Sequence, residues 1–169
     1  MKVSDYKQLA ARLAVLLTLV MASPLNFNVH AQNSKMASLI SEIKAELPGR
    51  QKEISEKCGG ASVIMEVDFA SFGDNYDALL KVPQQGLKET TNGFRRFCTN
   101  SNRTSEEDPD KVNAVKTKVK KIVIKHVPKL EQKKISLQDG GTVLMEMAFG
   151  QSGGGLSLVE IQRMLGEVL

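Results

Sequence analysis

The segment Ala61–Phe69 has the clearest strand pattern in the chain and constrains the fold most. Its apolar residues fall at every second position and its polar residues lie between them, with Ile64 as the exception. This alternation is typical of a β-strand that buries one face. Cys58 lies shortly before the segment, and Cys98 lies on a predicted helix after it. We therefore expect the rest of the chain to pack on this strand and its partner strands.

The first 31 residues have the pattern of a secretory signal peptide. Three basic residues precede an apolar run, Leu13–Ala22, and a short motif of small residues ends at Ala31. We expect cleavage after Ala31 and export of the protein to the periplasm or the extracellular space. The alternative is an uncleaved membrane anchor, but spanning a bilayer takes about 20 apolar residues, more than this run supplies. No later segment has the length and apolar character of a membrane span.

Removal of the signal peptide leaves residues 32–169, which we expect to form a single α+β domain. The 138 remaining residues are typical of one domain and can bury a core without metal ions. They carry 20 basic and 18 acidic residues, a net charge of +2.

The two cysteines, Cys58 and Cys98, predict one disulfide bond, because exported proteins fold in an oxidising compartment. A catalytic thiol is the alternative. It would need surroundings that lower the pKa of the thiol, whereas both cysteines fall on apolar faces of predicted helices.

The first half of the mature chain predicts a helix, a strand and a further helical region. The first helix should begin at Asn33 or Ser34, break or kink at Pro48–Gly49, and end before the strand. Helical spacing resumes at Tyr76 and again from Gln85 to Cys98, although Gly93 weakens that prediction. The polar stretch that follows contains a glycosylation sequon, Asn102–Thr104.

The second half predicts a short helix, three strands and a last helix. Asp108–Pro109 should begin the short helix. Strands should follow at 120–127, 134–138 and 142–149, with a hairpin turn at Asp139–Gly141. Ser157 and Glu160 form a capping box for the last helix. This order predicts a two-layer α+β fold, with about four strands in a largely antiparallel sheet and helices packed on one face.

The carboxylates Glu66, Asp68 and Glu146 should share the sheet face that points away from the helices. Two carboxylates can act as acid and base in glycoside hydrolysis, or bind Ca²⁺. A spacing of two residues along a strand is the ordinary result of pleating, so we favour a solvated face over a catalytic or calcium-binding pair.

The histidine and glycine motifs do not indicate catalysis or a bound cofactor. His126 is the only histidine after the signal peptide, and no nucleophile motif accompanies it, so a sheet histidine without a catalytic role is the simpler interpretation. The glycine-rich stretch at 150–155 lacks the Lys–Ser/Thr ending of a phosphate loop. We expect neither a metal nor a cofactor.

A run of lysines is the most functional-looking feature of the sequence. Nine lysines lie between residues 111 and 134, against one acidic residue. Seven of them form a candidate surface for an anionic envelope polymer or an acidic protein: Lys118, Lys120, Lys121, Lys125, Lys129, Lys133 and Lys134. Nucleic acid is disfavoured, because the run contains no aromatic residue to stack on bases. Lysines that only solvate a sheet and protect its edge are the simpler interpretation.

These observations favour a small exported, disulfide-bonded binding or interaction protein without catalytic activity. The alternatives are a small envelope hydrolase that uses Glu66 or Asp68, and a proteinaceous inhibitor of an enzyme.

Overall fold

A computed structural model describes residues 24–99 and 106–169, with side chains from residue 33 onward. Residues up to Ser38 and residues Leu39–Leu169 are two separate units, and the second contains the sheet. Residues 1–23 of the predicted signal peptide and the sequon Asn102–Thr104 lie outside the described residues. The predicted cleavage site falls within a helix, α2, and remains a prediction.

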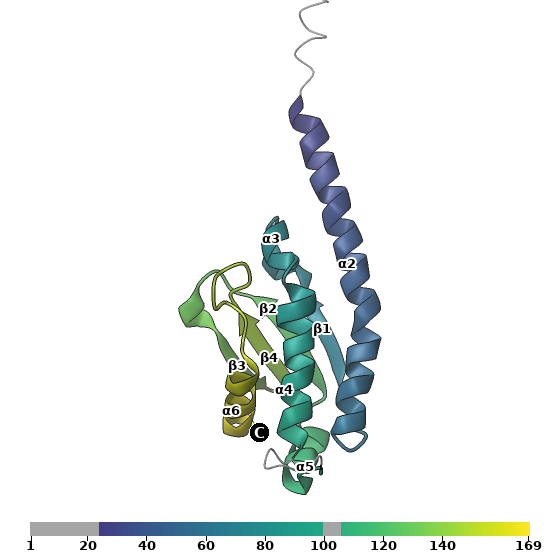
Figure 1. Cartoon of the computed structure of the whole chain (residues 1–169), viewed down its shortest axis with the longest axis vertical. Coiled ribbons are helices and arrows are strands. Elements are labelled where there is room, and N and C mark those ends of the chain that lie inside the picture. Colours follow the sequence, from purple (N-terminus) through teal and green to yellow (C-terminus); the bar gives the residue numbers. More distant parts are fainter. Residues whose placement is uncertain (1–23, 100–105) are drawn as a thin grey trace, which may run out of the picture. The chain divides into compact units, whose positions relative to one another are not determined.

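The fold is α+β, with helices packed on a four-stranded mixed sheet (Figure 1). The strands are β1 (Ile64–Asp68), β2 (Lys121–His126), β3 (Lys134–Gln138) and β4 (Thr142–Met147), in the order β1-β2-β4-β3. The helices are α2 (Pro24–Lys57), α3 (Tyr76–Leu79), α4 (Glu89–Cys98), α5 (Pro109–Lys118) and α6 (Leu158–Val168). A π-helical segment, η2 (Val82–Lys88), leads into α4, and short 3-10 turns follow β1 and β2.

The prediction of a largely antiparallel sheet is wrong. β1 and β4 both run parallel to β2, and only β3 and β4 are antiparallel. The reason is connectivity. The chain between β1 and β2 returns through α4 and α5 to the end of the sheet where β1 began, as a parallel crossover requires. The hairpin at Asp139–Gly141 joins β3 to β4, but β3 lies at the sheet edge, so β4 pairs with β2.

Most predicted elements form where their sequence signals indicate, and the first helix is the exception. α2 begins at Pro24 instead of Asn33 or Ser34, and it continues through Pro48 without a break. Both predicted caps of the later helices are present. Asp108 accepts a hydrogen bond from the main-chain N–H of Lys111, and Ser157 accepts one from that of Glu160.

The core lies on one face of the sheet, and the strand register explains which residues reach it. Adjacent positions on β1, β2 and β4 bring together Met65, Ile122 and Val143, and then Val67, Ile124 and Met145. All of these side chains are buried. The alternation of apolar and polar residues in Ala61–Phe69 therefore correctly predicts which face of β1 is buried.

Gly93 allows α4 and α6 to pack closely. A Cβ atom at this position would lie 2.3 Å from Cγ2 and 2.8 Å from Cβ of Ile161, which is fully buried. Both distances are shorter than any real van der Waals contact. The glycine that weakened the helix prediction is therefore required by the contact between the two helices.

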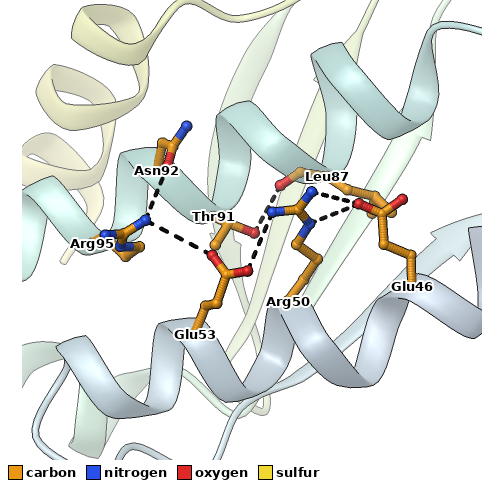
Figure 2. Close-up of polar contacts among 7 residues, drawn as sticks. All are labelled: Glu46, Arg50, Glu53, Leu87, Thr91, Asn92 and Arg95. Carbon is orange, nitrogen blue, oxygen red and sulfur yellow. Dashed lines mark hydrogen bonds and ion pairs between the residues drawn. The ribbon is translucent and has the colours of Figure 1, made fainter.

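The predicted disulfide bond Cys58–Cys98 is present and joins the end of α2 to the end of α4, with 5.3 Å between the Cα atoms. A second link between these helices is polar: Glu53 of α2 pairs with Arg95 of α4 (Oε2 to Nη1, 3.8 Å), as Figure 2 shows. The crossover explains the bond. Because α4 carries the chain back toward the start of β1, Cys98 returns to the place where Cys58 precedes that strand.

We predict that Gly93→Ala lowers the free energy of unfolding by about 1–3 kcal/mol, the usual cost of overpacking a core. Urea denaturation measures the effect. Gly49→Ala is the matched control, because Gly49 is also helical and a Cβ atom there meets nothing within 4 Å. The control should gain stability, by at most about 1 kcal/mol. Equal effects of the two substitutions would contradict the proposed contact.

We predict that the double substitution Cys58→Ala and Cys98→Ala destabilises the protein by about 4 kcal/mol, the chain-entropy value for a loop of this size. The bonded residues are 40 positions apart. Chemical denaturation with and without a reductant tests this, since the reductant should destabilise the wild-type protein and leave the variant unchanged. A wild-type protein that is insensitive to the reductant would contradict the prediction.

Candidate functional site

The second face of the sheet is more exposed than the core face, and we call it the open face. It consists of the alternate strand positions Ile64, Glu66, Asp68, Lys121, Val123, Lys125, Lys134, Ser136, Gln138, Thr142, Leu144 and Glu146. Ile64, Val123 and Leu144 are its aliphatic residues, and the side chain of Ile64 is 53% exposed.

Lysines of β2 alternate with the carboxylates of β1 and β4 across the open face. Lys121 pairs with Glu66 (Nζ to Oε1, 3.0 Å), and Lys125 lies in register between Asp68 and Glu146. Lys134 of β3 and Lys125 both pair with Glu146, at 3.4 and 3.7 Å. The lysines of β2 therefore lie between the two carboxylates of β1 and the carboxylate of β4.

This arrangement is a ladder of opposite charges, and it differs from a catalytic carboxylate pair. Glu146 is 9% exposed, so its charge is satisfied mainly by the two lysines beside it. Cross-strand pairs of this kind stabilise a sheet by about 0.2–1 kcal/mol each. Glu66 and Glu146 thus hold neighbouring strands together, whereas Asp68 accepts a hydrogen bond from the main-chain N–H of Ser71 in the turn after β1.

The seven lysines of the predicted anionic-partner surface are divided among several places. Lys121, Lys125 and Lys134 belong to the ladder on the open face. Lys129 pairs with Glu131, while Lys133 pairs with Glu160 and donates a hydrogen bond to the carbonyl of Gly153. Only Lys118 and Lys120 of the seven have no ion-pair partner among the described residues, and both lie just before the start of β2.

His126 lies at the carboxyl end of β2 against two aromatic rings. Its ring stacks on Phe72 at 5.2 Å between centroids and lies 6.2 Å from Phe149. Its Nδ1 atom is buried and has no hydrogen-bond partner in the described part of the chain. Burial lowers the pKa of His126, and the main chain of Met147 opposes this shift in part. The lowered pKa favours the neutral imidazole, which lies beside a cavity of about 330 Å³ that Asp77 also lines.

The glycine-rich stretch after β4 is a well-bonded connector. The carbonyl of Gly154 accepts a hydrogen bond from the N–H of Ala148 (2.8 Å), and the Gln151 side chain donates one to the carbonyl of Pro128. A Cβ atom at Gly154 would lie 1.8 Å from the Ala148 oxygen, so only glycine fits there. The glycine at position 154 is therefore required by this tight turn.

A basic cavity at the ends of the helices was not predicted from the sequence. It has a volume of about 430 Å³, and its described lining residues are Lys57, Asn92, Arg95, Arg96, Thr99 and Leu158. These residues come from the end of α2, the last turns of α4 and the start of α6. The chain brings them together only when it folds, so no single sequence segment carries a signal for the cavity.

Comparison of the chain with protein-family models, curated proteins and solved structures finds no match. Within residues 24–99 and 106–169, no helix is long and apolar enough to cross a membrane. In the same ranges, no three His, Cys, Asp or Glu side chains gather as ligands of a metal ion would.

We predict that lowering the pH from about 7.5 to about 5.5 destabilises the protein through His126. The pKa of His126 is lower in the folded state than its usual value of 6.5. The stability contribution is therefore complete above that value and is lost as the pH falls toward the folded pKa. Thermal melting across this range measures the effect. His126→Phe keeps the aromatic stack and should melt at a nearly constant temperature, and an equal decrease in both proteins would contradict the prediction.

Proposed function

We propose that this chain is a small exported, disulfide-bonded interaction protein that binds a protein partner through the open face and performs no catalysis. The signal-like first 31 residues and the disulfide bond support export. The observation that carries the binding proposal is the exposed aliphatic residue Ile64, which lies beside a ladder of alternating charges on the less buried sheet face.

The composition of the open face favours a particular kind of partner. It carries three lysines and three carboxylates, so its formal charge is balanced. A balanced pattern of alternating sign complements a protein surface that carries both charges, since electrostatic complementarity provides specificity and register. A uniformly anionic polymer would meet Glu66, Asp68 and Glu146 as well as the lysines. We therefore favour a protein partner of mixed charge over an anionic envelope polymer.

The arrangement of the layers supports the same interpretation. The helices bury the core face, and we propose that they leave the open face uncovered for the partner. The apolar centre of a protein interface is typically surrounded by polar residues. Val123 and Leu144, half-buried between neighbouring strands, would extend the apolar contact made by Ile64.

The two alternatives differ in how well they are supported. An enzyme inhibitor is a special case of the proposed binding, in which the partner is an enzyme. A hydrolase that uses Glu66 or Asp68 is less well supported, because a lysine lies beside each carboxylate. Lys121 pairs with Glu66, and Lys125 lies in register with Asp68. Turnover of peptidoglycan or polysaccharide that is lost in Glu66→Gln and Asp68→Asn would replace the present proposal.

We predict that Ile64→Arg weakens partner binding by about tenfold or more, because it replaces an exposed aliphatic contact of the proposed interface with a charge. The partner is first isolated by affinity capture from an envelope extract, identified and purified, and binding is then measured by calorimetric titration. Val159→Arg is the matched control, because Val159 is 69% exposed and belongs to α6. Equal binding by both variants, or the lack of any saturable protein partner, would overturn the proposal.

A further inference from the structure

The basic cavity at the helix ends has the composition of an anion-binding site. Of its six described lining residues, three are cations, namely Lys57, Arg95 and Arg96, and none is acidic. The amide of Asn92 and the hydroxyl of Thr99 add hydrogen-bonding groups. Arginine presents several N–H donors in a planar fork, which matches the oxygens of phosphate and sulfate.

Two of the three cations are available to a ligand. Arg95 pairs with Glu53 and donates a hydrogen bond to Asn92, as Figure 2 shows, so part of its charge is already satisfied. Lys57 and Arg96 have no ion-pair partner among the described residues. Cations in the last turn of a helix also offset the helix dipole, which would account for each of them singly. The helix dipole does not explain why cations from two different helices line the same cavity.

The disulfide bond fixes the walls of this cavity. Lys57 directly precedes Cys58, and Thr99 directly follows Cys98, so the covalent bond holds two lining residues from separate helices beside each other. The Glu53–Arg95 ion pair holds the same two helices together one turn away (Figure 2). A site whose main chain is held in place before binding loses less entropy when the ligand arrives.

We infer that this cavity binds an oxyanion, and the cavity favours one that is part of a small organic ligand, such as a phosphate or sulfate ester. Its volume of about 430 Å³ lies within the range of small-molecule sites. Leu158 supplies an apolar wall beside the cations. The site is separate from the open face, and the inference does not depend on the proposed protein partner.

The test is an NMR titration of the oxidised protein with two probes, inorganic phosphate and phenyl phosphate, against sodium chloride at matched ionic strength. We expect saturable amide shifts in the segments that line the cavity, around Lys57, from Asn92 to Thr99, and at Leu158. Tighter binding of phenyl phosphate identifies an organic ester as the ligand class, and equal affinities identify the free oxyanion. Shifts that do not saturate, or that lie elsewhere, overturn the inference.

Two double variants separate a built site from a general charge effect. Lys57→Gln with Arg96→Gln should weaken binding by about tenfold or more, because the ligand loses charge-assisted hydrogen bonds to both side chains. Lys118→Gln with Lys120→Gln also removes two positive charges from side chains that lack ion-pair partners, but these lie outside the cavity. This second variant should leave the affinity unchanged. Neither variant breaks an ion pair, so both should melt as the wild type does. An equal loss of affinity in the two variants overturns the inference.

Discussion

The parallel pairing of β2 with both of its neighbours is the constraint on which the rest of the structure depends. Ile122 and Ile124 of β2 are fully buried, and each lies in register with apolar residues of β1 and β4. Parallel strands cannot be joined by a tight turn, so the chain must return along the sheet between β1 and β2. α4 and α5 provide that return, and α4 then packs on α6 at Gly93.

This connectivity gives the two ends of the sheet different chemistry. At the amino end of β1, the return of α4 brings Cys98 to Cys58 and places Lys57, Arg95 and Arg96 around one cavity. At the carboxyl end, His126 packs against Phe72 and Phe149 beside the tight glycine turn. The first end is basic and open to a ligand. The second combines two aromatic rings with a cavity that Asp77 also lines, and burial lowers the pKa of the imidazole there.

The parallel order also determines what the charged residues of the sheet can do. Lys121 pairs with Glu66 of β1, and Lys125 lies in register between Asp68 and Glu146, so the two lysines of β2 are used within the sheet. Lys57 and Arg96, which line the basic cavity near the disulfide bond, have no ion-pair partner among the described residues. The proposed anionic ligand and the proposed protein partner would therefore use separate surfaces of this molecule.

The sequence by itself determined the local elements of this protein, because their signals lie within a few residues. The alternation in Ala61–Phe69, the cap at Asp108 and the capping box at Ser157 all act locally, and the two cysteines define a single possible intramolecular bond. Only the tertiary structure decided strand direction and order, since these depend on which distant segments pair. For the same reason it alone revealed the basic cavity, whose residues lie between positions 57 and 158, and the pairing of the predicted lysines with glutamates. Even α2 continues through Pro48, where the local signal predicted a break or a kink.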